Sequence, residues 1–468
     1  MSMELLAPCG GFEQLSFSIA FGANAVYLAS EKFGMRAKAK NFKIEEFTKI
    51  VDFAHKNNVR VYVTCNILMH DKNLKELEEH FKILADAKVD AFIIGDLGAM
   101  AIAKKVAPEV DIHVSTQASV ANTQAAVQYA KLGAKRIVLA REMSLDEIAK
   151  MRVELDKLGF KDSQENPNSL ALEAFVHGAM CMSVSGRCLI SSYLTGRSAN
   201  KGLCTQPCRW CYKLLEEKRP GQEFEIVEDN FGTYIMNSKD LKMIEHLDKL
   251  QQAGVSSLKI EGRNKKSLYV ATVVNAYRHA LDCLEEGTFS ENIDYWNDEL
   301  NNVSHRPYST GFYFGEAQQS QDYDGYEQNC VHVADVCDCK EQKLGYLWWK
   351  RSQFKVRVLC RNRFEEGQTL EALIPGQDIK SVKILDLTEC KFSSNKSSND
   401  TNKAAASVSS SASSSLSSKK AVTLGSAKSC KVANHAKSEY IFTSNFQIPA
   451  GSLLRSTEFL RTSRKNCQ

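Results

Sequence analysis

The segment KLGAKRIVL, residues 131–139, joins the end of a helix-like stretch to a short apolar run through a turn that contains a glycine. A similar unit, with glycine or a charged residue in the turn, recurs in residues 20–28 (AFGANAVYL), 85–94 (ADAKVDAFII) and 252–260 (QAGVSSLKI). Repeated units of helix, turn and strand are typical of right-handed βαβ crossovers onto a parallel sheet. The repetition therefore predicts a parallel α/β fold.

Eight such apolar runs precede residue 290, and helix-like stretches separate most of them. Eight strands in this length fit a (β/α)8 barrel of the TIM type. An open doubly wound sheet is the alternative, although no G-x-G-x-x-G motif follows the first run, which weakens a dinucleotide-binding interpretation. The predicted strands are residues 4–8, 25–29, 60–68, 91–96, 111–116, 136–141, 171–178 and 256–262.

The pattern changes after residue 290, and we expect three successive regions. Residues 1–290 would form the barrel, including a cysteine-rich loop at 178–212, and residues 291–340 an irregular connecting arm. Short strands in residues 341–460 predict a small antiparallel β-barrel. A serine-rich run at 393–420 interrupts it and is too polar and too low in complexity to pack, so we expect a disordered loop there.

Composition limits the location of the protein and the state of its thiols. Hydrophobic residues make up 43% and charged residues 25%, and the net charge of +4 is too small by itself to indicate a nucleic-acid partner. No signal peptide and no apolar stretch long enough to span a membrane are visible in the sequence. We therefore expect a cytoplasmic protein whose thiols stay reduced, so clustered cysteines indicate metal binding better than disulfides.

Five of the 15 cysteines lie in residues 173–212, with the spacing C-x6-C-x15-C-x3-C-x2-C. Only Cys208 and Cys211 have the close spacing of a zinc knuckle. An iron–sulfur cluster tolerates the irregular spacing because four thiolates need only converge in space. The spacing leaves a cluster, zinc and structural thiols open. A cluster would take Cys181, Cys188, Cys204 and Cys208 and leave Cys211 as a spare.

Polar residues at the carboxyl ends of the predicted strands are the candidates for chemistry, because TIM-type barrels carry their active sites at that face. His177 is a candidate acid, base or substrate contact, or else a buried core histidine. Lys259, Glu261 and Arg263 alternate along the last strand, either as a salt-bridged interior or as a site for carboxylates. Candidates to hydrogen-bond a substrate at other strand ends are Gln117 and Asp96.

Basic residues are frequent in three loops expected at the same face. They indicate either solvated loop charges or an anionic substrate, such as a phosphate-bearing metabolite or an RNA backbone. The loops carry Arg36, Lys38, Lys40 and Lys43; Arg187, Arg197, Lys201 and Arg209; and Arg263, Lys265 and Lys266.

The blocks GAMCMSVSGRCLISSYLTGR (178–197) and GLCTQPCRW (202–210) resemble the signature of the collagenase-like peptidases of unknown catalytic type, family thirty-two. Further blocks that carry the resemblance are HVSTQASVAN (113–122), YIMNSKDL (234–241) and SLKIEGRNKKSLYV (257–270). The likeness is close from residue 3 to about residue 330 and looser beyond it. Within the family, the sequence looks most like bacterial proteins that hydroxylate the wobble uridine of certain tRNAs to 5-hydroxyuridine.

This resemblance implies an RNA hydroxylase with tRNA as its partner, an iron–sulfur cluster, expected to be 4Fe–4S, and prephenate as an acidic co-substrate. It assigns Cys181, Cys188 and Cys204 to the cluster, with Cys208 as the natural fourth ligand because Lys242 stands where some relatives have cysteine. Whether a partner protein completes the enzyme is left open. The expected catalytic residues are His177, Glu261 and Arg263, and the expected substrate-binding residues are Arg187, Lys259, Gln117 and Asp96.

Proteolysis is the alternative that the family name suggests. The sequence contains neither a G-x-S-x-G elbow nor an H-E-x-x-H helix, so a dyad of His177 and Cys181 would have to supply the nucleophile. A thiolate bound to iron is not a free nucleophile. A hydrolase should therefore survive the loss of iron, whereas a cluster-dependent hydroxylase should not.

Overall fold

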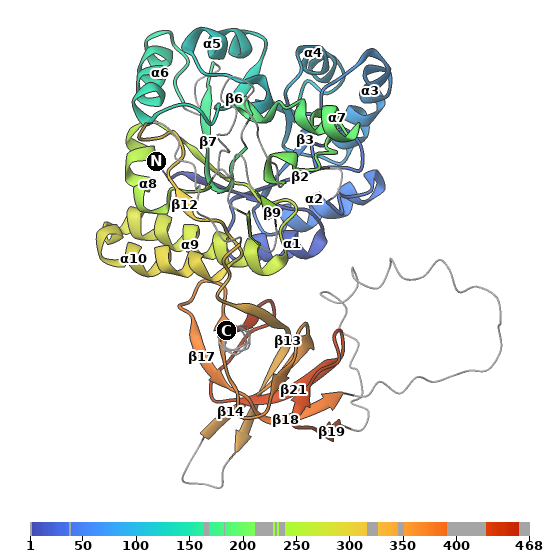
Figure 1. Cartoon of the computed structure of the whole chain (residues 1–468), viewed down its shortest axis with the longest axis vertical. Coiled ribbons are helices and arrows are strands. Elements are labelled where there is room, and N and C mark those ends of the chain that lie inside the picture. The colour runs from blue at the N-terminus through green and yellow to red at the C-terminus, as the bar shows by residue number, and fades with distance from the viewer. Residues whose placement is uncertain are drawn as a thin grey trace, which may run out of the picture. The chain divides into compact units, whose positions relative to one another are not determined.

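The computed structural model describes residues 2–36, 39–162, 168–181, 183–210, 228–229, 232–233, 239–315, 326–344, 351–390 and 427–457. The chain divides into two compact units, Met1–Gln328 and Asn329–Gln468 (Figure 1). Cys211, Lys38 and the serine-rich segment 393–420 lie outside the described residues. None of the described helices is both long and apolar enough to cross a lipid bilayer.

The first unit is a closed barrel of eight parallel strands, which confirms the predicted (β/α)8 architecture. Each strand pairs in parallel with the next, and the last strand, β11, pairs with both β7 and β1. The strands are β1 (Glu4–Pro8), β2 (Ala25–Leu28), β3 (Arg60–Cys65), β4 (Ala91–Ile94), β5 (Asp111–Val114), β6 (Ala134–Val138), β7 (Ala171–Ala179) and β11 (Ser257–Ile260).

Helices surround the strands of the barrel (Figure 1). Three of the turns from helix to strand contain a glycine with a positive φ, 93° at Gly22, 99° at Gly133 and 82° at Gly254. Only glycine adopts this conformation without strain, which explains the repeated turn. The helices are α1 (Phe12–Ala20), α2 (Phe47–His55), α3 (Asp71–Asp86), α4 (Leu97–Val106), α5 (Thr123–Lys131), α6 (Leu145–Lys157), α8 (Leu247–Gln252), α9 (Ser267–Glu286) and α10 (Phe289–Glu299).

Additional elements extend the first unit beyond the eight-stranded barrel. The strand β10 (Asp240–Lys242) pairs antiparallel with β7, and β12 (Tyr308–Ser309) pairs with β10. A buried ion pair of 2.7 Å between Arg306 and Asp240 fixes this extension. Residues 291–315 thus belong to the barrel unit, and the boundary after Gln328 falls inside the segment 291–340 that we expected to be a connecting arm. A separate two-stranded pair consists of β8 (Glu228–Asp229) and β9 (Gly232–Thr233).

The second unit is an antiparallel sheet that curls around one hydrophobic core, as predicted for the C-terminal region. Alternating apolar residues such as Val356, Val358 and Phe442 supply that core. The sheet order is β17 (Lys380–Lys383), β16 (Thr369–Leu373), β22 (Leu453–Ser456), β13 (Val331–Leu344), β14 (Arg351–Cys360), β21 (Glu439–Ser444), β18 (Leu385–Cys390) and β19 (Ala427–Ser429), and β15 (Phe364–Glu365) pairs separately with β20 (Val432–Ala433).

A buried network of charged side chains fills part of the barrel interior. Lys259 Nζ lies 2.7 Å from Glu173 Oε1, and Arg136 Nη1 lies 3.0 Å from Glu173 Oε2. Ser257 donates to Glu4 at 2.9 Å and Arg136 also pairs with Glu4. Burial alone would raise the pKa of Glu4, but Arg136 and its neighbours outweigh this effect and lower that pKa to about 2. Glu4 is therefore ionised at neutral pH.

Glu173→Gln should destabilise the protein, because it leaves the buried ammonium of Lys259 without its carboxylate. Removing one partner of a buried ion pair typically costs about 3 kcal/mol or more. Glu154→Gln is the matched control, since Glu154 pairs with Lys157 on the surface and its loss should cost less than about 1 kcal/mol. Denaturant unfolding of the two variants measures the difference, and equal losses would contradict a stabilising role for the interior network.

Candidate functional site

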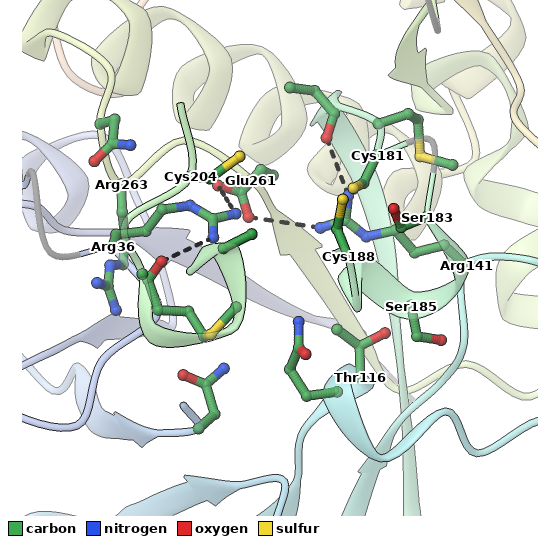
Figure 2. Close-up of a pocket in the computed structure, with 18 of the residues that line it drawn as sticks. Arg36, Thr116, Arg141, Cys181, Ser183, Ser185, Cys188, Cys204, Glu261 and Arg263 are labelled. Carbon is green, nitrogen blue, oxygen red and sulfur yellow. Dashed lines mark hydrogen bonds and ion pairs between the residues drawn. The ribbon is translucent and has the colours of Figure 1, made fainter. Parts of the chain in front are cut away.

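A cavity of about 490 Å³ opens at the carboxyl ends of the barrel strands. One side consists of residues from the strands β2 to β7 and β11 and from segments that follow them, and the other side consists of the cysteine loop, which we define as residues 181–210. Figure 2 shows the side chains of Cys181, Cys188 and Cys204 directed toward Glu261 and Arg141 across this space. The cavity thus lies where TIM-type barrels carry their active sites.

The cysteine loop begins two residues after β7 and contains four short helical segments: η3 (Val184–Gly186), α7 (Ile190–Thr195), η4 (Ala199–Lys201) and η5 (Pro207–Arg209). Ser185 anchors it to the barrel, because its backbone N–H donates to Glu142 at 2.7 Å. Asn200 ties the loop together through two 3.1 Å hydrogen bonds with the backbone of Cys188. The backbone carbonyl of Asn200 also accepts a hydrogen bond from the backbone N–H of Leu68 at 2.8 Å.

Four thiols from this loop line the cavity: Cys181, Cys188, Cys204 and Cys208. None of the four forms a disulfide in the described structure, and all are exposed or half-buried. Within the part of the chain that the structure describes, no three His, Cys, Asp or Glu side chains lie close enough together to hold a metal ion. The donor set fits a thiolate-bound cluster in type and number, and binding would require the loop to draw the thiols together.

Glu261 is the central anion of the cavity (Figure 2). Arg36 lies 3.2 Å and Arg141 3.5 Å from its two carboxylate oxygens. Burial would raise the pKa of Glu261, but these arginines and Arg263 outweigh it and lower that pKa, so the carboxylate stays ionised. Arg141 also donates to the carbonyl of Ala179 at 3.0 Å, which links the last strand to the start of the cysteine loop.

Cations outnumber anions in the cavity wall. Arg263 is buried and donates to Thr64 at 2.6 Å, but no ion pair joins it to a carboxylate among the described residues. Burial and the nearby Arg36 lower the pKa of Arg263 to about 10, so it remains charged at neutral pH. Five of the described residues that line the cavity are cations, and Glu261 is the one anion among them. Because Glu173 already neutralises Lys259, an excess of three positive charges remains, which favours an anionic ligand. The five cations are Arg36, Arg141, Lys259, Arg263 and Lys265.

A neutral polar wall follows β3 and β5. Asn66 Nδ2 donates to Ser115 Oγ at 3.2 Å, and Thr116 donates to the carbonyl of Leu139 at 3.1 Å. The Asn66 Oδ1 atom is buried and has no hydrogen-bond partner within the described residues. Together with the amide of Gln117, this wall offers donors and acceptors suited to a flat polar group such as a nucleobase edge.

Three of the predicted site residues do not line the cavity. His177 is 1% exposed and packs against the rings of Tyr269, Tyr277 and Tyr308. Burial, followed by the nearby Lys242 and Lys265, lowers the pKa of His177 well below its ordinary value, so the imidazole is neutral. Neither ring nitrogen has a hydrogen-bond partner in the described structure.

Asp96 and Arg187 have other positions. The Asp96 carboxylate accepts from the backbone N–H of Ala99 at 2.9 Å and caps the amino end of α4. Arg187 is exposed, and its charge opposes the burial that raises the pKa of Tyr129. The remaining predicted residues, Gln117, Lys259, Glu261, Arg263 and the four cysteines, do line the cavity.

Sequence reasoning did not choose Arg141 or Asn66 as binding residues and named Arg36 only as one of several basic loop residues, yet all three line the cavity. Asn66 lies near the end of the predicted strand 60–68 and Arg141 ends the predicted strand 136–141, and that position was the available signal. Arg36 lies in the long segment between β2 and α2, so only the folded chain reveals its contact with Glu261.

Comparison with known proteins identifies the family of this chain. Residues 10–323 match the model of peptidase family U32, which spans more than half of the chain. The chain belongs to peptidase family U32. The resemblance predicted from the cysteine-rich signature is thereby confirmed.

Three U32 relatives show the range of names in the family. An uncharacterized protease of Methanocaldococcus jannaschii is 40% identical over 321 residues, covering 69% of this chain and 75% of the relative. The tRNA hydroxylation protein P of Haemophilus influenzae is 32% identical over 420 residues, covering 80% and 86%. A collagenase of Porphyromonas gingivalis is 34% identical over 315 residues, covering 67% and 74%.

Alkylation of the reduced, metal-free protein should distinguish the thiols of the cysteine loop from those of the barrel. Cys181 and Cys204 are exposed and should react first, whereas Cys9 and Cys65 are buried and should react only on unfolding. Burial raises the pKa of Cys9 to about 12, so hardly any of its reactive thiolate exists at neutral pH. Peptide mass spectrometry over time measures the order. Labelling of Cys9 ahead of Cys204 would contradict the described cavity.

Proposed function

We propose that this protein is an RNA-modifying enzyme that hydroxylates the wobble uridine of tRNA to 5-hydroxyuridine. It would use a 4Fe–4S cluster and prephenate and would act where tRNA is modified, in the cytoplasm. The observation that carries the proposal is the composition of one cavity, in which four reduced thiols face an excess of positive charge and a neutral amide wall. A relative that aligns over 80% of this chain bears the name tRNA hydroxylation protein P, which supports the same assignment.

The thiols of Cys181, Cys188, Cys204 and Cys208 are the residues that would hold the cluster. A cluster held by all four thiolates would supply electron transfer, whereas a Lewis-acidic position for a substrate oxygen would require one iron without a thiolate ligand. Arg36 lies close enough to Cys181 for their charges to interact, and Arg141 holds the carbonyl of Ala179 just before the loop. Both arginines would therefore offset the negative charge of four thiolates.

Arg263 is the cation best suited to a carboxylate of prephenate. Its guanidinium is held by Thr64, is largely secluded from water, and has no ion pair among the described residues. A buried arginine of this kind gains more from a carboxylate ligand than a solvated one, because the charge pair forms in a low dielectric. Lys259 is less available, since Glu173 already neutralises it at 2.7 Å.

The neutral wall supplies the contacts for the target base. Asn66 and Gln117 present carboxamide groups, and Ser115 holds one of them in place. Enzymes that modify a base take it out of its stack and hydrogen-bond its edge in a pocket. A uracil edge in this wall would leave the cationic side of the cavity for the co-substrate.

Proteolysis remains the alternative because relatives bear the names protease and collagenase. A Cys–His dyad is disfavoured by the position of His177, which is buried among tyrosines outside the cavity and is not hydrogen-bonded to Cys181. Peptidase activity that persists in iron-free protein would favour this alternative.

Cys188→Ala should abolish both the cluster and the modified nucleoside, because a cluster needs its thiolate ligands. Anaerobically purified wild-type protein should contain about four iron and about four sulfide per chain, and the variant should contain much less. The matched control is Cys283→Ala, which removes a half-buried thiol from α9 that does not line the cavity. Nucleoside mass spectrometry of tRNA, from a host that lacks its own tRNA hydroxylation protein, supplies the second readout.

Two results would contradict the proposal. Anaerobic wild-type protein without iron would remove the cluster, and a cluster-containing protein that restores no 5-hydroxyuridine would remove the tRNA assignment. The iron measurement and the nucleoside measurement therefore test the two parts separately.

Arg263→Gln should raise the prephenate concentration needed for half-maximal hydroxylation about tenfold or more, since hydrogen bonds to charged groups carry this much binding energy. Iron content should stay at the wild-type level because Arg263 holds no cluster ligand. Arg278→Gln is the control, as Arg278 pairs with Asp282 on α9, outside the cavity. An unchanged prephenate requirement in a folded, iron-loaded Arg263→Gln variant would assign the co-substrate to other cations.

A further inference from the structure

The cysteine loop exposes an unusual number of large apolar side chains. Seven of the sixteen exposed large hydrophobic residues of the described chain lie in this short segment. Tyr193 is 89%, Leu189 75% and Val184 67% exposed, which are the highest values among them. Exposed apolar side chains gathered in one segment are typical of interaction sites on folded proteins. The full set is Val184, Leu189, Ile190, Tyr193, Leu194, Leu203 and Trp210.

The short helix α7 determines which side chains face outward. Ser191 is buried, and its hydroxyl donates to the carbonyl of Arg197 at 2.7 Å and contacts Thr205 at 3.1 Å. Ile190 lines the cavity. Leu189, the residue before α7, and Tyr193 are four residues apart, so they share an exposed face on the side away from the buried Ser191. Trp210 directly follows η5, which packs against α7.

The charge of the same segment restricts the chemistry of a ligand. Residues 181–210 contain four basic residues and no acidic residue. Arg187 and Arg197 are exposed, and Lys201 is half-buried. A surface that combines exposed aromatic rings with positive charge suits single-stranded nucleic acid, because bases stack on the rings while phosphates contact the cations. Proteins that recognise RNA by its sequence usually bind single-stranded loops of the RNA, where the bases are unpaired.

We propose that the outer face of the cysteine loop is the docking surface for the single-stranded loop of the RNA substrate. Bases next to the target nucleotide stack on Tyr193 and Trp210, and their phosphates contact Arg187 and Arg197. This face lies next to the cavity, because the short helix α7 carries both Ile190, which lines the cavity, and the exposed Tyr193. The inference rests on the proposed function and adds the residues that select an unpaired RNA.

The proposed docking surface gives Arg187, which lies outside the cavity, a role in binding the RNA backbone. An exposed arginine beside the cavity contacts the phosphate backbone rather than the reacting base, so its loss changes affinity and salt dependence rather than chemistry. Arg187 is thus a positioning residue in this proposal.

The test uses the full-length protein and two fluorescent RNAs, a hairpin with a single-stranded loop and a blunt duplex of the same stem. Tyr193→Ser and Leu189→Ser are compared with Tyr295→Ser, which changes an exposed tyrosine on α10. Tyr193→Ser should weaken hairpin binding about tenfold, as expected for the loss of one stacked base, and should leave duplex binding unchanged. Arg187→Gln should reduce the slope of log affinity against log salt by about 0.7. Iron content and melting temperature confirm that each variant is folded and loaded.

Four outcomes would overturn the docking surface. Hairpin binding by Tyr193→Ser at the wild-type level would do so and leave the proposed function intact. Equal weakening toward hairpin and duplex would exclude stacking of unpaired bases. A wild-type dimer in sedimentation that Leu189→Ser dissociates would show that a second copy of the chain covers this face. Wild-type protein that binds neither RNA would overturn the docking surface and the proposed function together.

Discussion

Closure of the barrel between β7 and β11 is the constraint on which the site depends. The two strands pair in parallel, with a register shift between Lys259 and Ile260. A side chain at Gly178 would collide with the carbonyl of Glu261, because an added Cβ would lie 2.4 Å from that oxygen. This close approach places the end of β11, with its charged residues, directly beside the start of the cysteine loop.

The same closure divides the polar interior into two regions with different tasks. Below the cavity, Glu4 and Glu173 balance Arg136 and Lys259, although Lys259 also reaches the cavity wall. Toward the carboxyl ends, Glu261 is the only acidic side chain among the cavity-lining residues of the described chain. Charge is thus balanced where the barrel needs stability and left unbalanced where a ligand can supply the missing anion.

The sequence predicted the barrel well because its signals are local and repeated. Glycine turns and apolar runs identify the strands, and the strand ends identify Gln117, Glu261 and Arg263 as cavity residues. Long-range packing was beyond its reach. The rings that enclose His177 belong to Tyr269, Tyr277 and Tyr308, which are far from it in the sequence. The residues next to His177 in the chain therefore do not reveal that it is buried.

Asp96 shows the opposite limit, because two local signals compete at one position. An aspartate at a strand end suggests ligand binding, yet an aspartate directly before a helix is also a common N-cap, and here the carboxylate caps α4. Arg36 illustrates a third case. It lies far from Glu261 in sequence, and only folding brings their charges together.

One loop carries both the four cavity thiols and the helix α7 with its exposed Tyr193, and this has a thermodynamic consequence. Any ligand that fixes the loop from the cavity also fixes Tyr193, because α7 carries both the cavity-lining Ile190 and the exposed Tyr193. If the cysteine loop holds the cluster and docks the RNA as proposed, the two binding events would be coupled. Bound cluster would increase the affinity of the protein for RNA, and bound RNA would increase its affinity for the cluster by the same factor. Apo-protein would then discriminate poorly among RNAs, and substrate would protect the metal centre from loss.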